Sequence, residues 1–200
     1  MIDRAKGYFN REKETMSKRK RETYLKKRLS EILRYGYRYS KSIRLRFDAL
    51  GLKPEVIRDL KDLERLPITK KADLVSAQKG NPPFGGFEVI PKKGLRRIYM
   101  SPGPVFEPGE WGYQDIRWAQ ALYACGLRKG DVVLNTFNYH VTPLALMLDE
   151  SLQMLGATVV PVGPGNISMQ IQLMRQLHVT GYLGTPSFLM AITEAAEGMH

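Results

Sequence analysis

A tyrosine and a histidine occupy positions where an α/β fold would open a binding crevice. The segment 138–141, which contains Tyr139 and His140, follows the apolar run 131–136 and precedes Pro143, where we predict a helix. Ligands of such folds bind beyond the carboxyl ends of parallel strands. His140 therefore has two interpretations: it contacts a substrate, or its hydrogen bonds are satisfied within its own loop.

Other side chains with reactive groups have simpler explanations. Cys125 is the only cysteine, which excludes an internal disulfide, and we predict a buried, inert thiol on the apolar side of a helix with Trp118 and Leu122. With only three histidines, we expect no metal site. His178 ends a predicted helix, where a positive charge is stabilising. The segment 163–166 is interpreted as a turn with an N-cap, because no Lys or Arg lies near it in sequence to help bind an anion.

The positive charge is concentrated near the N-terminus. The 200 residues carry a net charge of +11, of which residues 1–50 hold +10, whereas residues 101–200 hold −4. The basic segment, residues 11–46, has three interpretations: a solvated helix face, a site for an acidic partner or subunit, or a contact to nucleic acid or anionic membrane. Nucleic acid is disfavoured because no fold signature for it occurs elsewhere.

Composition favours a protein with a sizeable core in a reducing compartment. Hydrophobic residues make up 43% of the chain and charged residues 26%. No apolar run reaches the ~18–20 residues of a membrane span, and the first residues lack the apolar stretch of a secretory signal. Together with the single cysteine, these features predict a cytoplasmic location.

The first part of the chain is predicted to be helical. Residues 8–47 form one long helix or two shorter ones, with a possible bend at Gly36 and an end before Gly51. The apolar positions that share one helical stripe are Tyr24, Leu25, Leu29, Ile32, Leu33 and Tyr37. A second helix follows Thr69 as N-cap, and the turn-rich segment 79–86 is a boundary loop.

From about residue 95, strands and helices are predicted to alternate. The strands are 95–100, 131–136, 157–161 and 179–183, and the helices are 112–125, 143–155, 166–178 and 187–197. A Pro/Gly loop is expected from Ser101 to Gly109. Continuous apolar strands separated by helices indicate a parallel α/β sheet. The predicted fold class is therefore α/β, with a basic helical region (1–80) followed by part of a parallel, doubly wound sheet (81–200). Because only about four strands precede the end at His200, we expect a fragment or one subunit of a split protein.

Residues 47–74 and several later motifs resemble the phenylacetate–coenzyme A ligase family of adenylate-forming enzymes. The first stretch contains Leu63-Glu64-Arg65-Leu66-Pro67-Ile68-Thr69-Lys70-Lys71-Ala72-Asp73-Leu74, which is similar to the family's "LxxLP-x-TxKxDL" segment after a basic helical start. The motifs at 126–133, 155–161, 170–174 and 185–188 follow in the family's order. The resemblance covers roughly residues 10–198.

The family's phosphate loop, S-S-G-T-T-G-K-P, aligns with residues 101–108. Ser101, Gly103 and Pro108 match the pattern, and five positions differ. The resemblance therefore assigns the phosphate-loop equivalents, in degenerate form, to Ser101, Gly103, Pro104, Val105, Phe106 and Glu107.

The substitutions in this loop all disfavour phosphate binding. Pro102 and Pro104 lack an N–H donor, and Val105 lacks a hydroxyl. Phe106 replaces a glycine that would let phosphate approach, and Glu107 replaces a lysine. At ~4 Å from a triphosphate, this reversal of charge is unfavourable by an amount on the order of kilocalories per mole. Three alternatives remain: a degenerate, non-hydrolysing member, a loop that binds ATP through other groups or a partner chain, and a different alignment.

The resemblance implies ATP-dependent activation of an aromatic carboxylic acid through an acyl-adenylate, followed by transfer to coenzyme A. It implies ATP with magnesium and coenzyme A as cofactors, and places Tyr139 and His140 along the acyl pocket. The adenine pocket, the ribose-binding acid and the lysine of the mobile C-terminal domain lie beyond the region of resemblance, so no catalytic residue is assigned. The chain is either a ligase-family member completed by a downstream domain or second polypeptide, or a non-catalytic protein that keeps the fold to hold an acyl ligand or partner.

Overall fold

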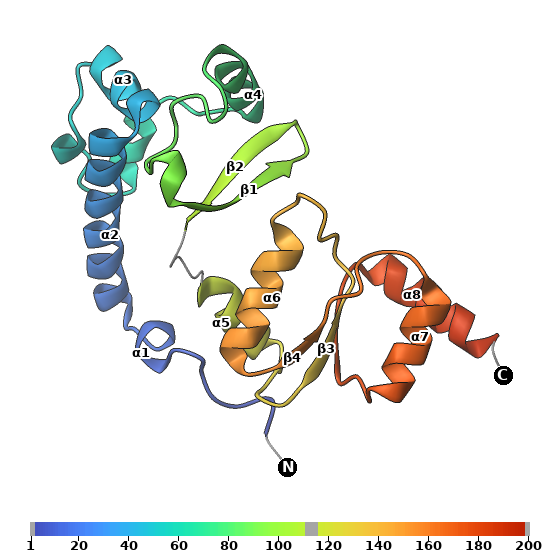
Figure 1. Cartoon of the computed structure of the whole chain (residues 1–200). Coiled ribbons are helices and arrows are strands. Elements are labelled where there is room, and N and C mark those ends of the chain that lie inside the picture. Colours follow the sequence, from blue (N-terminus) through green and yellow to red (C-terminus); the bar gives the residue numbers. More distant parts are fainter. Residues whose placement is uncertain (1–2, 111–115, 199–200) are drawn as a thin grey trace. The chain divides into compact units, whose positions relative to one another are not determined.

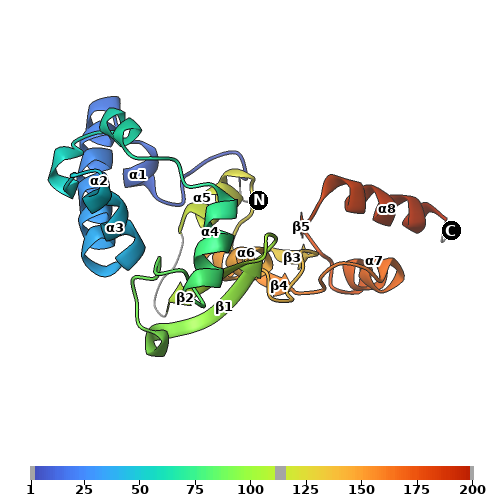
Figure 2. The same ribbon diagram turned by 90° about the horizontal axis from the view of Figure 1, so that it is seen from above.

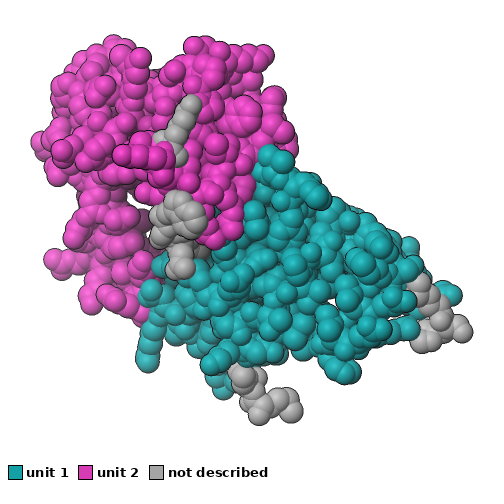
Figure 3. Space-filling view, viewed as in Figure 1, with its two compact units in different colours: residues 1–11, 114–200 teal, residues 12–113 magenta. Residues whose placement is uncertain are grey.

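The chain forms two compact units (Figure 3). The structure, a computed structural model, describes residues 3–110 and 116–198. One unit comprises residues 1–11 and 114–200, and the other comprises residues 12–113. The chain therefore enters the first unit, builds the second, and returns to the first. The predicted division into residues 1–80 and 81–200 stays a prediction. Its boundary falls within the unit of residues 12–113.

One long helix, several short ones and a β-hairpin make up the unit of residues 12–113 (Figure 1). Its elements in order are α1 (Arg11–Glu14), α2 (Lys18–Tyr39), α3 (Lys41–Ala49), η1 (Pro54–Val56), η2 (Lys61–Arg65), α4 (Lys71–Gly80), η3 (Lys92–Gly94), β1 (Leu95–Ser101) and β2 (Val105–Glu110). Every helix within the described part of the chain is too short or too polar to cross a membrane.

The long N-terminal helix breaks at Ser40 and not at Gly36. Gly36 stays inside α2 and is buried, and a Cβ added there would lie 3.0 Å from Ile43 Cδ1. The glycine therefore allows α2 and α3 to pack closely. Ser40 ends α2 and caps α3, because its hydroxyl oxygen accepts the Ile43 N–H at 3.3 Å. The same hydroxyl donates to Gly86 O at 2.9 Å, which fastens the break to a distant loop.

Strands β1 and β2 pair antiparallel over the segment where a loop was expected. The prediction of a loop from Ser101 to Gly109 is wrong beyond residue 104, because residues 105–110 form β2. Pro108, which disfavoured a strand, pairs opposite Ile98. In a two-stranded sheet each strand has a free edge, so proline's missing N–H need not interrupt the pairing.

The other unit is a parallel sheet with helices on both faces. Its elements are α5 (Ile116–Ala124), β3 (Val132–Asn135), α6 (Leu144–Leu155), β4 (Thr158–Val160), α7 (Ile167–Gln176), β5 (Gly181–Leu183) and α8 (Pro186–Glu197). The strand order is β4-β3-β5, and both pairings are parallel. Helices α5 and α6 cover one face, and α7 and α8 lie on the other (Figures 1 and 2). This arrangement confirms the predicted α/β fold class.

The core of this unit lies between α5, α6 and the central strand β3. Its buried side chains are Ala119, Leu122, Val133, Leu148, Leu152, Leu155 and Ala157. Val133 of β3 and Leu152 of α6 are fully buried, and the burial of Val133 is expected for a strand covered on both faces. Burial of such side chains stabilises the fold by roughly 1.5–3 kcal/mol each.

A buried carboxylate ties the N-terminal segment to the start of β3. Asp131, whose side chain is 4% exposed, accepts two hydrogen bonds of 2.7 Å from the Arg4 guanidinium. It also accepts the Arg128 N–H at 2.6 Å and the Thr180 hydroxyl at 2.8 Å. The Arg128 guanidinium donates to the carbonyls of Arg4 and Lys6, so the segment is held by its backbone as well.

Candidate functional site

The residues aligned with the phosphate loop form a tight hairpin turn. In the β1–β2 register Ser101 pairs with Val105, so only residues 102–104 connect the strands. Val105 is buried, Phe106 is exposed and Glu107 is half-buried. The connection is therefore a tight turn with paired strands on both sides.

A backbone donor next to this turn, in β2, is already used. The Phe106 N–H donates to Gln78 Oε1 at 2.8 Å, and the Phe106 carbonyl accepts from Gln78 Nε2 at 2.8 Å. Gln78 lies on α4, so its side chain joins this helix to the beginning of β2. Pro102 and Pro104 have no N–H group, and the Phe106 N–H is bonded to Gln78. These three residues therefore offer no free backbone donor to a ligand.

Two groups beside the turn still favour an anion. Ser101 Oγ is buried and has no hydrogen-bond partner within the described residues. Lys71, the first residue of α4, lies across the turn, since a Cβ added to Gly103 would be 3.1 Å from Lys71 Cε. Sequence reasoning missed Lys71 because it is 32 positions before Gly103. The available signal was the Thr69-Lys70-Lys71 part of the family motif.

The helix that carries Lys71 starts one residue later than predicted. Lys70, and not Thr69, is its N-cap. The Lys70 N–H donates to Asp73 Oδ2 at 2.8 Å, which satisfies a donor at the helix start. The Thr69 hydroxyl accepts from the Arg46 guanidinium instead.

The second candidate site is the carboxyl edge of the parallel sheet. From β3 the chain passes to β4 on one side and later to β5 on the other, so β3 marks the switch point of the sheet. Asn135 and Thr136, at the end of β3, are buried. The Thr136 hydroxyl donates to Leu183 O at 2.9 Å, which joins the ends of β3 and β5.

Tyr139 and His140 lie in the same loop but in different environments. Asn135 Nδ2 donates to the Tyr139 hydroxyl at 2.8 Å, and that hydroxyl donates to Asp149 Oδ2 at 3.1 Å. Burial, and then the neighbouring Asp149 carboxylate, raise the pKa of Tyr139 well above its ordinary value, so it remains a neutral donor. His140 is exposed, and its backbone N–H donates to Asn138 Oδ1 at 2.8 Å.

A close approach at the end of β5 was not predicted. A Cβ at Gly184 would collide with the hydroxyl oxygens of Thr136 and Tyr182, so only glycine fits. The Tyr182 hydroxyl donates to Thr185 O at 3.2 Å. The motif at 185–188 pointed to this region, but the contact joins residues almost 50 positions apart and depends on the fold.

Two smaller predictions have opposite outcomes. The turn at 163–166 is confirmed, because Asn166 caps α7 through the Met169 N–H and Gln170 Nε2 donates to the carbonyls of Gly163 and Gly165. The prediction that Cys125 is buried is wrong, since it is exposed. Helix α5 ends at Ala124, so Cys125 does not continue its apolar face.

The described residues contain no group of three or more His, Cys, Asp or Glu side chains placed to bind a metal ion.

The candidate site consists of two places in the described residues: the turn with Lys71 and Ser101 in one unit, and the carboxyl edge of the sheet in the other. The first offers a cation and a hydroxyl, and the second offers the hydrogen-bonding groups of Asn135, Thr136 and Tyr139 with the Asp149 carboxylate beside Tyr139.

Sequence relatives agree with the predicted family. Phenylacetate-coenzyme A ligase of Aromatoleum evansii is 33% identical over 86% of this chain. The enzyme of the same name from Thermus thermophilus is 31% identical over 93% of it, and that of Escherichia coli (strain K12) is 32% identical over 85%. The chain is homologous to these ligases. It spans only 40%, 42% and 39% of their respective lengths.

Solved structures confirm the fold. A 2-hydroxyisobutyryl-CoA ligase in complex with 2-HIB-AMP and CoA matches 99% of this chain and 45% of its own, with a TM-score of 0.86 and 22% identity. The same ligase in its postadenylation state, in complex with R3-HIB-AMP, gives a TM-score of 0.88. No protein-family model matches the chain.

Proposed function

We propose that this chain is part of a phenylacetate–CoA ligase-like protein and does not bind MgATP in the usual way on its own. The proposal rests on the β1–β2 turn, where Pro102 and Pro104 lack donors, Gln78 occupies the Phe106 amide, and Glu107 adds negative charge. These residues do not fit a triphosphate. Lys71 and the Ser101 hydroxyl are the groups that would still contribute to anion binding.

The remaining parts of the ligase reaction would come from outside these residues. Because the chain spans about 40% of its curated relatives, we propose that a downstream region or a second polypeptide completes the fold. In that assembly the carboxyl edge near Tyr139 would line the pocket for an aromatic acid. Coenzyme A and ATP are expected for the family, and no described residue is assigned to coenzyme A.

A calorimetric titration of the 200-residue chain with MgATP tests the proposal. We expect no heat of binding at millimolar nucleotide. A dissociation constant below about 100 μM, equivalent to ~5.5 kcal/mol, would contradict it. The converse test restores the family's residues with Pro104→Thr, Val105→Thr, Phe106→Gly and Glu107→Lys, which should produce measurable pyrophosphate binding.

A smaller variant guards against misfolding. Val105 is buried, so a threonine there places a hydroxyl in an apolar site. Phe106→Gly with Glu107→Lys leaves Val105 intact and should give part of the gain, whereas Glu110→Lys, an equal charge change at the far end of β2, should give none. If the folded variants bind no pyrophosphate, the alignment of residues 101–108 with a phosphate loop is wrong.

A non-catalytic binding protein is the second candidate. It is favoured by the hydrogen bonds of the Tyr139 hydroxyl, which join it to Asn135 and Asp149. Neither partner belongs to the β1–β2 turn. An acyl ligand could therefore bind without nucleotide. Titration with phenylacetate alone separates the two candidates, since only this candidate expects saturable binding that Tyr139→Phe weakens.

A further inference from the structure

Helix α2 carries apolar side chains that its own unit covers only in part. Leu25, Ile32 and Tyr39 are spaced seven residues apart and therefore lie on one side of the helix. Their exposed fractions are 44%, 64% and 50%. Gly36 is the one residue of α2 that is fully buried. A helix with this pattern would ordinarily bury the apolar side against another element.

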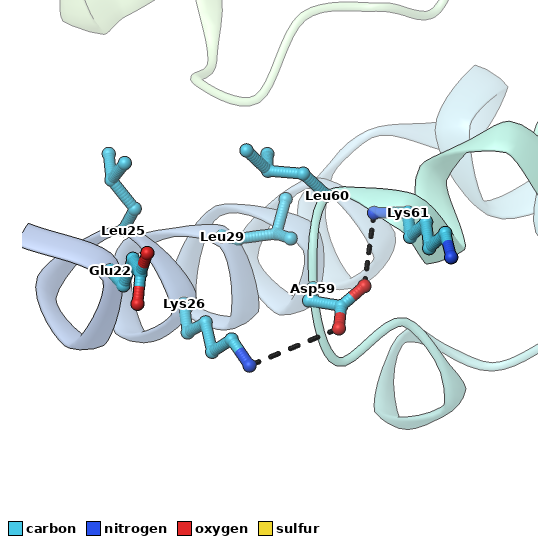
Figure 4. A pocket seen from close by; sticks show the side chains of 7 residues that line it. All are labelled: Glu22, Leu25, Lys26, Leu29, Asp59, Leu60 and Lys61. Carbon is cyan, nitrogen blue, oxygen red and sulfur yellow. Dashed lines mark hydrogen bonds and ion pairs between the residues drawn. The ribbon is translucent and has the colours of Figure 1, made fainter. Parts of the chain in front are cut away.

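The face includes a groove with apolar walls (Figure 4). Leu25 and Leu29 of α2 form one wall and Leu60, which precedes η2, forms the other, around a volume of about 220 Å³. Leu60 is 62% exposed. At the rim Asp59 accepts the Lys61 N–H at 3.0 Å and lies 3.9 Å from Lys26 Nζ, so its charge is partly compensated (Figure 4).

The same face becomes strongly basic toward the start of α2. This helix has a charge of +7, because it contains nine basic residues (Lys or Arg) and two Glu residues. Lys18 and Arg21 precede Leu25 by seven and four residues, which places them on the apolar side. Arg19 and Lys20 belong to the same run but fall on other sides of the helix.

We propose that this face binds an acidic amphipathic helix of a partner protein. An apolar side chain of that helix would enter the groove, and carboxylates four and seven residues further along an antiparallel helix would reach Arg21 and Lys18. The spacing follows from the 1.5 Å rise per residue, which puts these cations ~6 and ~10 Å from Leu25 along the axis. The proposal goes beyond ligase-type chemistry and does not depend on it.

The charges favour such a partner over other occupants. The charge of +7 on α2 attracts an acidic helix and repels the same helix of a second copy. Nucleic acid offers no apolar side chain for the groove. Anionic lipid would meet Glu22 and Asp59 at the groove. A second copy could still offer α8, which is acidic and exposes Met190, so the experiment must test it.

The test uses a fluorescein-labelled synthetic peptide in which one leucine is followed by glutamates at the fourth and seventh positions in a helix-forming background. We expect saturable binding by fluorescence anisotropy at 50 mM salt. Leu25→Ser with Leu60→Ser should weaken it at least fivefold, and Lys18→Ser with Arg21→Ser at least threefold. The matched control, Arg19→Ser with Lys20→Ser, removes the same charge and should change affinity less than twofold.

Five outcomes would overturn the proposal. A scrambled peptide or polyglutamate that binds equally well would show attraction by charge alone, as would equal losses in the two charge variants. Concentration-dependent mass in sedimentation without peptide, abolished by the Leu variant, would make a second copy the occupant. Binding of phosphatidylserine vesicles or of a 20-base DNA with the same dependence on Leu25 would assign the face to that class. A folded Leu variant, verified by circular dichroism, that binds the peptide as wild type would exclude the groove.

Discussion

Replacing Asp131 by asparagine should destabilise the unit that contains the parallel sheet, and the loss should depend on pH. Asp131 receives four donors, of which the Arg4 guanidinium supplies two. The bonds from Arg4 are the main reason that the pKa of Asp131 falls from 3.8 to about 2. Asparagine keeps the shape, but it has a single acceptor oxygen and directs an N–H₂ group toward donors.

The pKa shift sets the size of the effect. A decrease from 3.8 to about 2 corresponds to roughly 2 kcal/mol of stability for the charged form. Because the Arg4 side chain is 51% exposed, solvent weakens the pair, and we expect a loss of about 1–2 kcal/mol at pH 7. A depressed pKa stabilises the fold above the unfolded-state value, so this contribution is present above pH ~4 and decreases as pH falls toward 2.

Urea unfolding of wild type and Asp131→Asn at pH 7 and at pH 2.5 measures both quantities. The difference between the two proteins should be largest at pH 7 and clearly smaller at pH 2.5. Asp3→Asn, which removes an exposed acid from the same N-terminal segment, serves as the control and should behave as wild type. An equal loss at both pH values would mean that packing, and not charge, makes Asp131 important.

Two further predictions concern a close contact and a charged surface. Gly184→Ala should destabilise the fold by about 1–3 kcal/mol in chemical denaturation, because its Cβ collides with the Thr136 and Tyr182 hydroxyls, and Tyr182→Phe should recover part of the loss by removing one of them. Stability equal to wild type would contradict this close approach at Gly184. Changing residues 18–21 together to serine should leave the thermal midpoint nearly unchanged, since these side chains are exposed. A large decrease in calorimetry would instead show that the run packs against the protein.

The sequence was most informative where strands are buried on both faces. The apolar runs around Val133 and Val159 predicted β3 and β4 to within two residues. For β3 the reason is that a central parallel strand has no polar face to interrupt the pattern. Strand β2 was missed because Pro108 argues against a strand unless the strand has a free edge. Cys125 was misplaced because helix ends are poorly fixed by periodicity.

The candidate site was less predictable because its contacts join distant residues. Gln78 occupies the Phe106 amide across 28 positions, and Tyr139 is oriented by Asp149 on the following helix. Neither contact leaves a periodic signal. The motif that includes Lys71 indicated a family, but its position beside Gly103 follows only from the packing of α4 against the hairpin.

The bonds from residues 4 and 6 to residues 128 and 131 have a consequence for synthesis. They join the two ends of a chain segment of more than 120 residues, within which residues 12–113 form a unit of their own. During translation that unit emerges complete while the N-terminal segment still lacks its acceptor. Thr180, the last donor to Asp131, emerges later still. The N-terminal segment therefore lacks the contacts of Arg4 and Lys6 until residues 128 and 131 have been made, after the whole of residues 12–113.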